Sequence, residues 1–150
     1  MIQRIQSVYL AVAIILLSIV TAGARIASFT SDEGELKLTS FGLFLKMQDS
    51  EDYIADFSMP LYVLGIVFVL LLVMTLLSYK KLKFQLSLAK LSFYVSLVFA
   101  GLVIATSFLF GSIAYGIGSY FIFISVLLTY LAMRGVKKDK SLIDSVDRIR

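Results

Sequence analysis

The chain has 150 residues, of which 59% are apolar and only 16% are charged. Its mean hydropathy of +0.93 is typical of a membrane protein and far above that of a small soluble domain. Because it contains no Cys, His or Trp, it cannot use disulfides, thiol chemistry, His-ligated metals or haem, or imidazole acid/base catalysis.

Three stretches free of charged residues predict the membrane spans: residues 5–24, 57–79 and 91–133. A span needs about 20 apolar residues to cross roughly 30 Å of hydrocarbon, so the first two stretches hold one span each. The third would extend about 65 Å as one helix, and we expect it to turn back at Gly111 and Ser112. The prediction is an all-α membrane protein with one domain over residues 1–150, an antiparallel bundle of four transmembrane helices at about 5–23, 60–79, 91–110 and 113–133.

The first stretch has a second interpretation. Ala22-Gly23-Ala24 follows the apolar residues 8–20 and matches the A-x-A pattern of a cleaved signal peptide. Only Arg4 precedes the apolar run as a charge, and the run is long enough for a full crossing. We therefore expect a retained first helix.

The connection 25–59 is too long to be a simple turn. Residues 35–39 and 43–47 are apolar-rich runs separated by Ser40-Phe41-Gly42, which predicts a small β-hairpin over the bundle. The acidic residues 49–52 follow as a solvated turn. They lack the spacing of a calcium-binding loop, so no metal site is predicted and calcium remains a minor alternative.

Small residues in the third and fourth helices predict close helix contacts. They recur four residues apart, as Gly101 and Ala105 in the third helix and as Gly116 and Gly118, paired with Ser112 and Ala114, in the fourth. Packing inside the bundle is the favoured interpretation, and a dimerisation face is the alternative.

Two basic segments flank these helices. Residues 80–90 combine leucines with four lysines and are predicted to lie at the membrane interface. In the tail 134–150, Leu142, Ile143, Val146 and Ile149 share one face of a short amphipathic helix, which Ser141 and Asp144 would begin as a capping box. We expect its apolar face to lie on the membrane surface, with a protein partner as the alternative. The candidate headgroup or partner contacts are Lys80, Lys81, Lys83, Arg134, Lys137, Lys138, Arg148 and Arg150.

Lys and Arg are distributed very unequally between the two sides of such a bundle. The two termini and the connection 80–90 together carry +8, whereas the connection 25–59 carries −4. The positive-inside rule then places both termini in the cytoplasm of a bacterial inner membrane and the loop 25–59 in the periplasm. Because topology explains the net positive charge, no nucleic-acid partner is expected.

The predicted spans contain no Asp, Glu, Lys or Arg. Ion-coupled transporters place ionisable groups inside the hydrocarbon, so the absence of such groups argues against a transporter. None of the common metalloprotease, thiol, serine-hydrolase or nucleotide-binding motifs is present. We expect no enzymatic activity, no catalytic residues and no cofactor.

Three stretches carry a family resemblance: the start Met1-Ile2-Gln3-Arg4-Ile5-Gln6, the basic linker 79–85 that ends in Gln85, and the tail 131–150 with its KKDxxLxxSxDRxR pattern. The chain resembles an uncharacterised family of four-helix inner-membrane proteins from Bacteroidota, a domain of unknown function. The resemblance implies this fold and location but no activity. Lys140 and Asp144 depart from the family pattern with exchanged charges, which suggests an ion pair between adjacent turns.

The predicted function is an accessory or scaffold subunit of a larger membrane complex, with membrane lipids and other membrane-protein subunits as partners. One alternative is a small carrier for a lipid, a quinone or another apolar ligand. Another is a membrane-surface sensor that acts through the basic tail.

Overall fold

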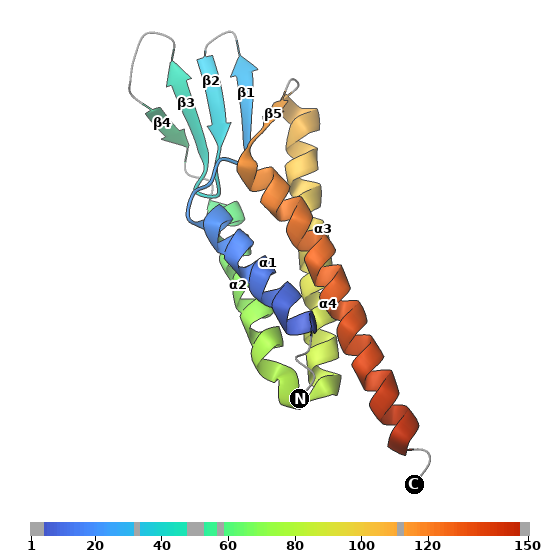
Figure 1. Ribbon diagram of the computed structural model, residues 1–150. Helices are drawn as coiled ribbons and strands as arrows, with labels where there is room; N and C mark the ends of the chain where they lie inside the picture. The colour runs from blue at the N-terminus through green and yellow to red at the C-terminus, as the bar shows by residue number, and fades with distance from the viewer. Residues whose placement is uncertain (1–4, 32–33, 48–52, 57–58, 111–112, 148–150) are drawn as a thin grey trace.

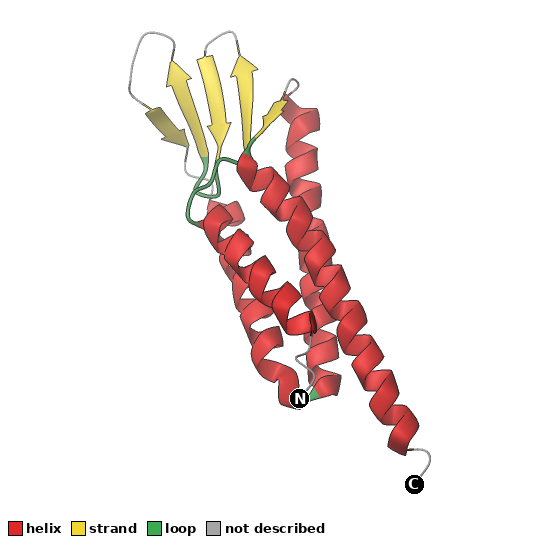
Figure 2. Cartoon of the chain, viewed as in Figure 1, coloured by secondary structure: helices red, strands yellow, loops and turns green. Residues whose placement is uncertain are grey.

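The computed structural model describes residues 5–31, 34–47, 53–56, 59–110 and 113–147. Within these residues, four long helices form a bundle and five strands form a sheet at one end of it (Figures 1 and 2). The helices are α1 (Ile5–Thr21), α2 (Met59–Leu77), α3 (Leu82–Phe110) and α4 (Ile117–Asp147), and a short 3₁₀ turn, η1 (Ser78–Lys80), joins α2 to α3. The strands are β1 (Ala27–Ser31), β2 (Gly34–Leu38), β3 (Leu43–Met47), β4 (Tyr53–Asp56) and β5 (Ile113–Tyr115).

Consecutive helices of the bundle run in opposite directions (Figure 1). Each helix packs against two others, so that α1 contacts α2 and α4, and α3 contacts the same two helices. The buried residues of α1 recur every three or four positions, as do those of α4, which is the spacing of two helices that pack at a shallow angle. The two stripes are Leu10, Ala13, Leu17 and Val20 on α1 and Ile122, Ser125, Thr129, Ala132 and Val136 on α4.

Aromatic rings fill the middle of the bundle. Phe68 of α2 and Phe99 of α3 are both fully buried, and their rings meet edge to face with centroids 6.4 Å apart. Such an edge contact adds about 0.5–1.5 kcal/mol to the burial of the two rings. These two rings join Leu10, Leu17 and Leu72 in one hydrophobic core.

Three of the helices, α2, α3 and α4, are long and apolar enough to cross a membrane. The 17-residue α1 is also apolar, but at 1.5 Å per residue it reaches only about 25 Å, somewhat less than the roughly 30 Å of hydrocarbon. Four complete spans therefore stay a prediction. The helix α1 contributes four residues to the core, and its retention over cleavage stays a prediction.

A glycine ends α1 and turns the chain toward the sheet. Gly23 has φ of +103°, a backbone conformation that favours glycine. Its N–H donates to the Val20 carbonyl at 3.1 Å, and the N–H of Ala24 donates to the Ile19 carbonyl at 3.4 Å. A Cβ on Gly23 would lie 2.7 Å from Cε2 of Phe41, whose ring also contacts Tyr62 with centroids 5.1 Å apart. The turn between β2 and β3 is thereby packed against the ends of α1 and α2.

The predicted hairpin is confirmed. Strands β2 and β3 pair in antiparallel fashion from Gly34–Met47 to Leu38–Leu43. The sheet is nevertheless larger than a hairpin, because β1 and β4 flank this pair and β5 pairs with β1, giving the order β4-β3-β2-β1-β5. The fold is therefore mainly helical with an antiparallel sheet, and the all-α description needs this correction.

Three predicted boundaries of the helices are wrong. The fourth helix begins at Ile117 and not at residue 113, because residues 113–115 hydrogen-bond to β1 as a strand. Residues 82–90 belong to α3 and do not form a separate interfacial stretch. The tail is not a separate short helix either: α4 continues to Asp147, and the hydroxyl of Ser141 donates to the Lys138 carbonyl at 2.8 Å within that helix, so it starts no capping box.

Candidate functional site

The functional candidates gather at the end of the bundle opposite the sheet. Here η1 joins α2 to α3, and α4 runs on past the start of α1 (Figure 1). We call this the basic end. Six of the eight predicted headgroup or partner contacts lie on its described part, namely Lys80, Lys81, Lys83, Arg134, Lys137 and Lys138; Arg148 and Arg150 lie outside the described residues.

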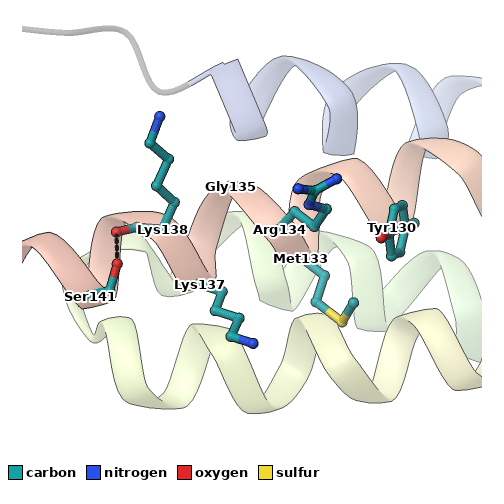
Figure 3. Close-up of a pocket in the computed structure, with 7 residues that line it drawn as sticks. All are labelled: Tyr130, Met133, Arg134, Gly135, Lys137, Lys138 and Ser141. Atoms are coloured by element: carbon teal, nitrogen blue, oxygen red, sulfur yellow. Dashed lines mark hydrogen bonds between the residues drawn. The ribbon is translucent and has the colours of Figure 1, made fainter.

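A groove of about 810 Å³ brings three of these cations together. It is lined by α4 alone among the described residues (Figure 3), and we call it the basic groove: Tyr130, Met133, Arg134, Gly135, Lys137, Lys138 and Ser141. Most of these positions recur three or four residues apart, so they share one side of the helix. That side faces away from the bundle, because the buried Ala132 and Val136 occupy the opposite side.

The basic groove is strongly cationic. Arg134, Lys137 and Lys138 are exposed, and within the described part of the chain no salt bridge involves any of them. The guanidinium carbon of Arg134 lies 5.9 Å from the centre of the Tyr130 ring, which is within the range of a cation–π contact. In Figure 3 the side chains of Lys137 and Lys138 point to opposite sides of α4, so the positive charge spreads across the groove.

A second, smaller groove of about 430 Å³ lies where α2 joins α3, lined by Leu77, Ser78, Lys80, Lys81 and Phe84. The ammonium nitrogen of Lys80 lies 5.9 Å from the centre of the Tyr79 ring. Lys83 is exposed on the first turn of α3 but does not line this groove. The predicted contacts therefore divide between two separate surfaces.

A polar contact between α1 and α4 was not predicted from the sequence. Gln6 is only 2% exposed, and its side-chain amide donates a hydrogen bond to the Asp139 carboxylate at 2.9 Å. Gly135 makes room for it, since a Cβ on that residue would lie 3.1 Å from both Cβ and Oε1 of Gln6. The contact joins the beginning of α1 to α4 immediately behind the basic groove.

A second buried glutamine lies between α2 and α3. Gln85 is 1% exposed, and its amide donates to the Thr75 carbonyl at 3.2 Å. The Thr75 hydroxyl in turn lies 3.4 Å from that of Ser92. The side-chain oxygens of Gln85 and Gln6 are both buried, and neither has a hydrogen-bond partner among the described residues. A buried acceptor without a hydrogen-bond partner costs about 1–3 kcal/mol of folding stability, so each of these two glutamines lowers the stability of the bundle relative to an apolar side chain of the same size.

A signal for Gln6 was present in the sequence. It is the first position of the buried stripe that continues through Leu10, Ala13, Leu17 and Val20. The absence of charged residues is enough to predict the span, and that prediction makes no use of the spacing that leads back to the glutamine. Gln6, Gln85 and Asp139 belong to the three stretches that carry the family resemblance, so part of that pattern serves packing inside the chain.

The four small residues expected to pack helices have different surroundings. A Cβ on Gly101 would meet nothing within 4 Å, and Ala105 is exposed as well. Gly116 and Gly118 instead lie against the backbone of Arg25: the N–H of Gly116 donates to Ile26 at 2.8 Å, and that of Gly118 donates to Arg25 at 2.9 Å. These two glycines therefore connect the sheet to α4, and the dimerisation alternative for the third helix stays a prediction.

No group of three acidic side chains is close enough to hold a metal ion in the part of the chain that the structure describes. The acidic residues 49–52, considered for calcium, lie outside it. The Asp144 side chain is also outside the described ones, and with it the proposed ion pair to Lys140.

The model of a family described as a domain of unknown function (DUF4293) matches residues 2–149. The match covers nearly the whole chain, including the bundle, the sheet and both ends of α4. No curated protein matches the chain.

Proposed function

The chain belongs to this family of unknown function, and from that premise we propose that it is an integral protein of the bacterial inner membrane that acts as an accessory or scaffold subunit of a larger complex. Three helices long and apolar enough to cross a membrane support the location. So does the outer surface of the bundle: on α2, for example, Val63, Val67 and Leu70 are 51%, 44% and 57% exposed. An apolar surface of this extent needs lipid or protein around it.

The charge distribution supports the orientation with the basic end in the cytoplasm. The segments at this end carry +8, and the sheet end with its flanking loops carries −4. Basic residues are retained on the cytoplasmic side when a chain inserts. The sheet would then lie in the periplasm.

The continuity of α4 carries the subunit proposal. The contact of Asp139 with Gln6 lies at the first turn of α1, and α4 continues to Asp147 beyond it as one helix (Figure 1). We call residues 140–147 the projecting segment. Because it extends a bundle helix along its own axis, it leads away from the membrane and does not lie flat on the surface.

The projecting segment nevertheless carries large apolar side chains. Leu142 is 56% and Ile143 is 45% exposed. Full burial of such a side chain is worth about 1.5–3 kcal/mol, so a partner that covered both would gain a substantial part of its affinity there. This argues for a cytoplasmic protein partner. The carrier alternative has less support, because Phe68 and Phe99 close the middle of the bundle, where a ligand would lie.

The test is purification of the tagged full chain from its native membrane in a gentle detergent, with quantitative mass spectrometry of the proteins retained. The informative variant is L142A/I143A, which removes apolar surface while keeping good helix formers. The matched control is S141A/S145A, since among the described residues the hydroxyls of these two serines of the same segment donate to the carbonyls of Lys138 and Leu142 on their own helix. We expect a stoichiometric partner with the wild type and the control, and its loss with L142A/I143A.

Two results would contradict the proposal. The first is a wild-type chain that purifies alone or only with a small apolar molecule, which would favour a carrier. The second is a partner retained equally by L142A/I143A and by the wild type, which would show that the projecting segment does not bind it.

A further inference from the structure

We propose that the basic groove binds the phosphate of an anionic phospholipid. Three cations, Arg134, Lys137 and Lys138, lie within five residues of α4 and line a groove that faces away from the bundle. The described lining of that groove includes no carboxylate. A phosphate group there would meet the planar guanidinium of Arg134, which is suited to two parallel hydrogen bonds. The ammonium groups of Lys137 and Lys138, on opposite sides of α4, would add to the positive potential around it.

The position of the groove along α4 fits the headgroup layer. The apolar part of the helix ends at Met133, and Arg134 follows directly with its cation over the Tyr130 ring. At the same end of the bundle, Tyr79 and Lys80 form the same kind of pair in η1, directly after α2. Aromatic rings and cations gather at the boundary between hydrocarbon and water, so the two pairs mark one plane. The groove lies across that plane, with Tyr130 and Met133 inside it and Lys137 and Lys138 beyond.

A phospholipid fits this arrangement better than free phosphate does. Met133 and Tyr130 line the groove on the hydrocarbon side of Lys137 and Lys138, where the upper part of an acyl chain would lie. Free phosphate would leave this surface uncovered. The inference depends on the membrane location proposed above but not on a protein partner, so the two can fail separately.

The experiment uses the purified full chain in a neutral detergent. Phosphatidylglycerol and phosphatidylcholine are titrated in separately, and the bound lipid is counted by native mass spectrometry. The test variant is R134Q/K137Q/K138Q, and the control is K80Q/K81Q/K83Q, which removes three charges from the other basic surface at the same end. All substituted residues are exposed, and the circular dichroism of each variant should match that of the wild type.

We expect one phosphatidylglycerol to bind more tightly than phosphatidylcholine. R134Q/K137Q/K138Q should weaken this binding about tenfold or more, the effect of losing one charge-assisted hydrogen bond. K80Q/K81Q/K83Q should change the affinity for phosphatidylglycerol less than about threefold, because these three charges act on the basic groove only over a long, screened distance.

Three results would overturn the inference. Equal losses in both variants would mean that only the total positive charge of the basic end matters. Equal binding of the two lipids would show that the phosphate charge is not recognised. Displacement of the lipid by millimolar inorganic phosphate would show that the groove selects free phosphate over a headgroup with its acyl chains.

Discussion

Gly118 and Gly101 are both small residues of long helices, yet the structure predicts opposite effects when either is replaced by Ala. A Cβ on Gly118 would lie 2.9 Å from the Arg25 carbonyl oxygen and 3.2 Å from that of Ala24, both backbone atoms that no rotamer change can move. Ordinary contacts begin at about 3.4 Å, so α4 or the segment before β1 must shift by about 0.5 Å. That shift also disturbs the hydrogen bond from the Gly118 N–H to Arg25. At Gly101 an added methyl group meets nothing within 4 Å.

Overpacking of this kind costs about 1–3 kcal/mol. Gly101→Ala should instead gain up to about 1 kcal/mol, because Ala loses less backbone entropy than Gly in a helix. For a chain of this length 1 kcal/mol shifts Tm by about 2–4 °C. We therefore expect Gly118→Ala to melt several degrees below the wild type and Gly101→Ala at or above it. The assay is far-UV circular dichroism of each purified variant during heating in one detergent.

The order of the two melting temperatures tests this reasoning. If Gly118→Ala melts at or above Gly101→Ala, the close contact between the start of α4 and Arg25 does not constrain the fold, and the reasoning fails. A Gly101→Ala protein that changes its oligomeric state would instead show that this exposed glycine lies in an interface between chains.

Three further predictions concern buried side chains. Gln6→Met and Asp139→Ala are combined in a double-mutant cycle, with unfolding followed in denaturing detergent. The coupling energy should be about 1.5–3 kcal/mol, as for a hydrogen bond to a charged group, and a coupling energy below about 0.5 kcal/mol would contradict the contact. Gln85→Met removes the hydrogen bond to Thr75 together with a buried oxygen that has no partner among the described residues. The same unfolding assay should therefore show a change within about 1 kcal/mol, and a loss above about 2 kcal/mol would mean that the oxygen has a partner. Phe29→Ala empties a site that is 1% exposed and should cost about 3–5 kcal/mol in thermal unfolding, whereas a loss below about 1 kcal/mol would separate the sheet from the core of the bundle.

Local patterns in the sequence predicted those elements whose partners are close along the chain. The β2–β3 hairpin was found because its two strands are separated by a short turn, Ser40-Phe41-Gly42, and pair with each other. Strand β5 was missed for the opposite reason. Ile113-Ala114-Tyr115 is an apolar triplet inside a long apolar run, and only its pairing with β1, more than eighty residues earlier, makes it a strand.

The candidate site was predicted in part for a similar reason. Charge counting placed Arg134, Lys137 and Lys138 at the basic end, and the structure brings them to one groove. The continuity of α4 could not be predicted from charge, because a change from apolar to charged residues marks a change of surroundings and not the end of a helix. Gln6 and Asp139 lie 133 positions apart, and no local pattern could pair them.

Strand β5 also sets an order for biosynthesis. Strand β1 is synthesised early, but its second neighbour, residues 113–115, follows only after α2 and α3. At about 5–20 residues per second, the ribosome needs roughly 4–17 s to bridge this separation. During that interval one edge of the nascent sheet stays open, and the Arg25 carbonyl lacks its donor, the N–H of Gly118. The sheet can thus be completed before the basic end, where Gln6 of the first helix must wait for Asp139 near the end of the last one.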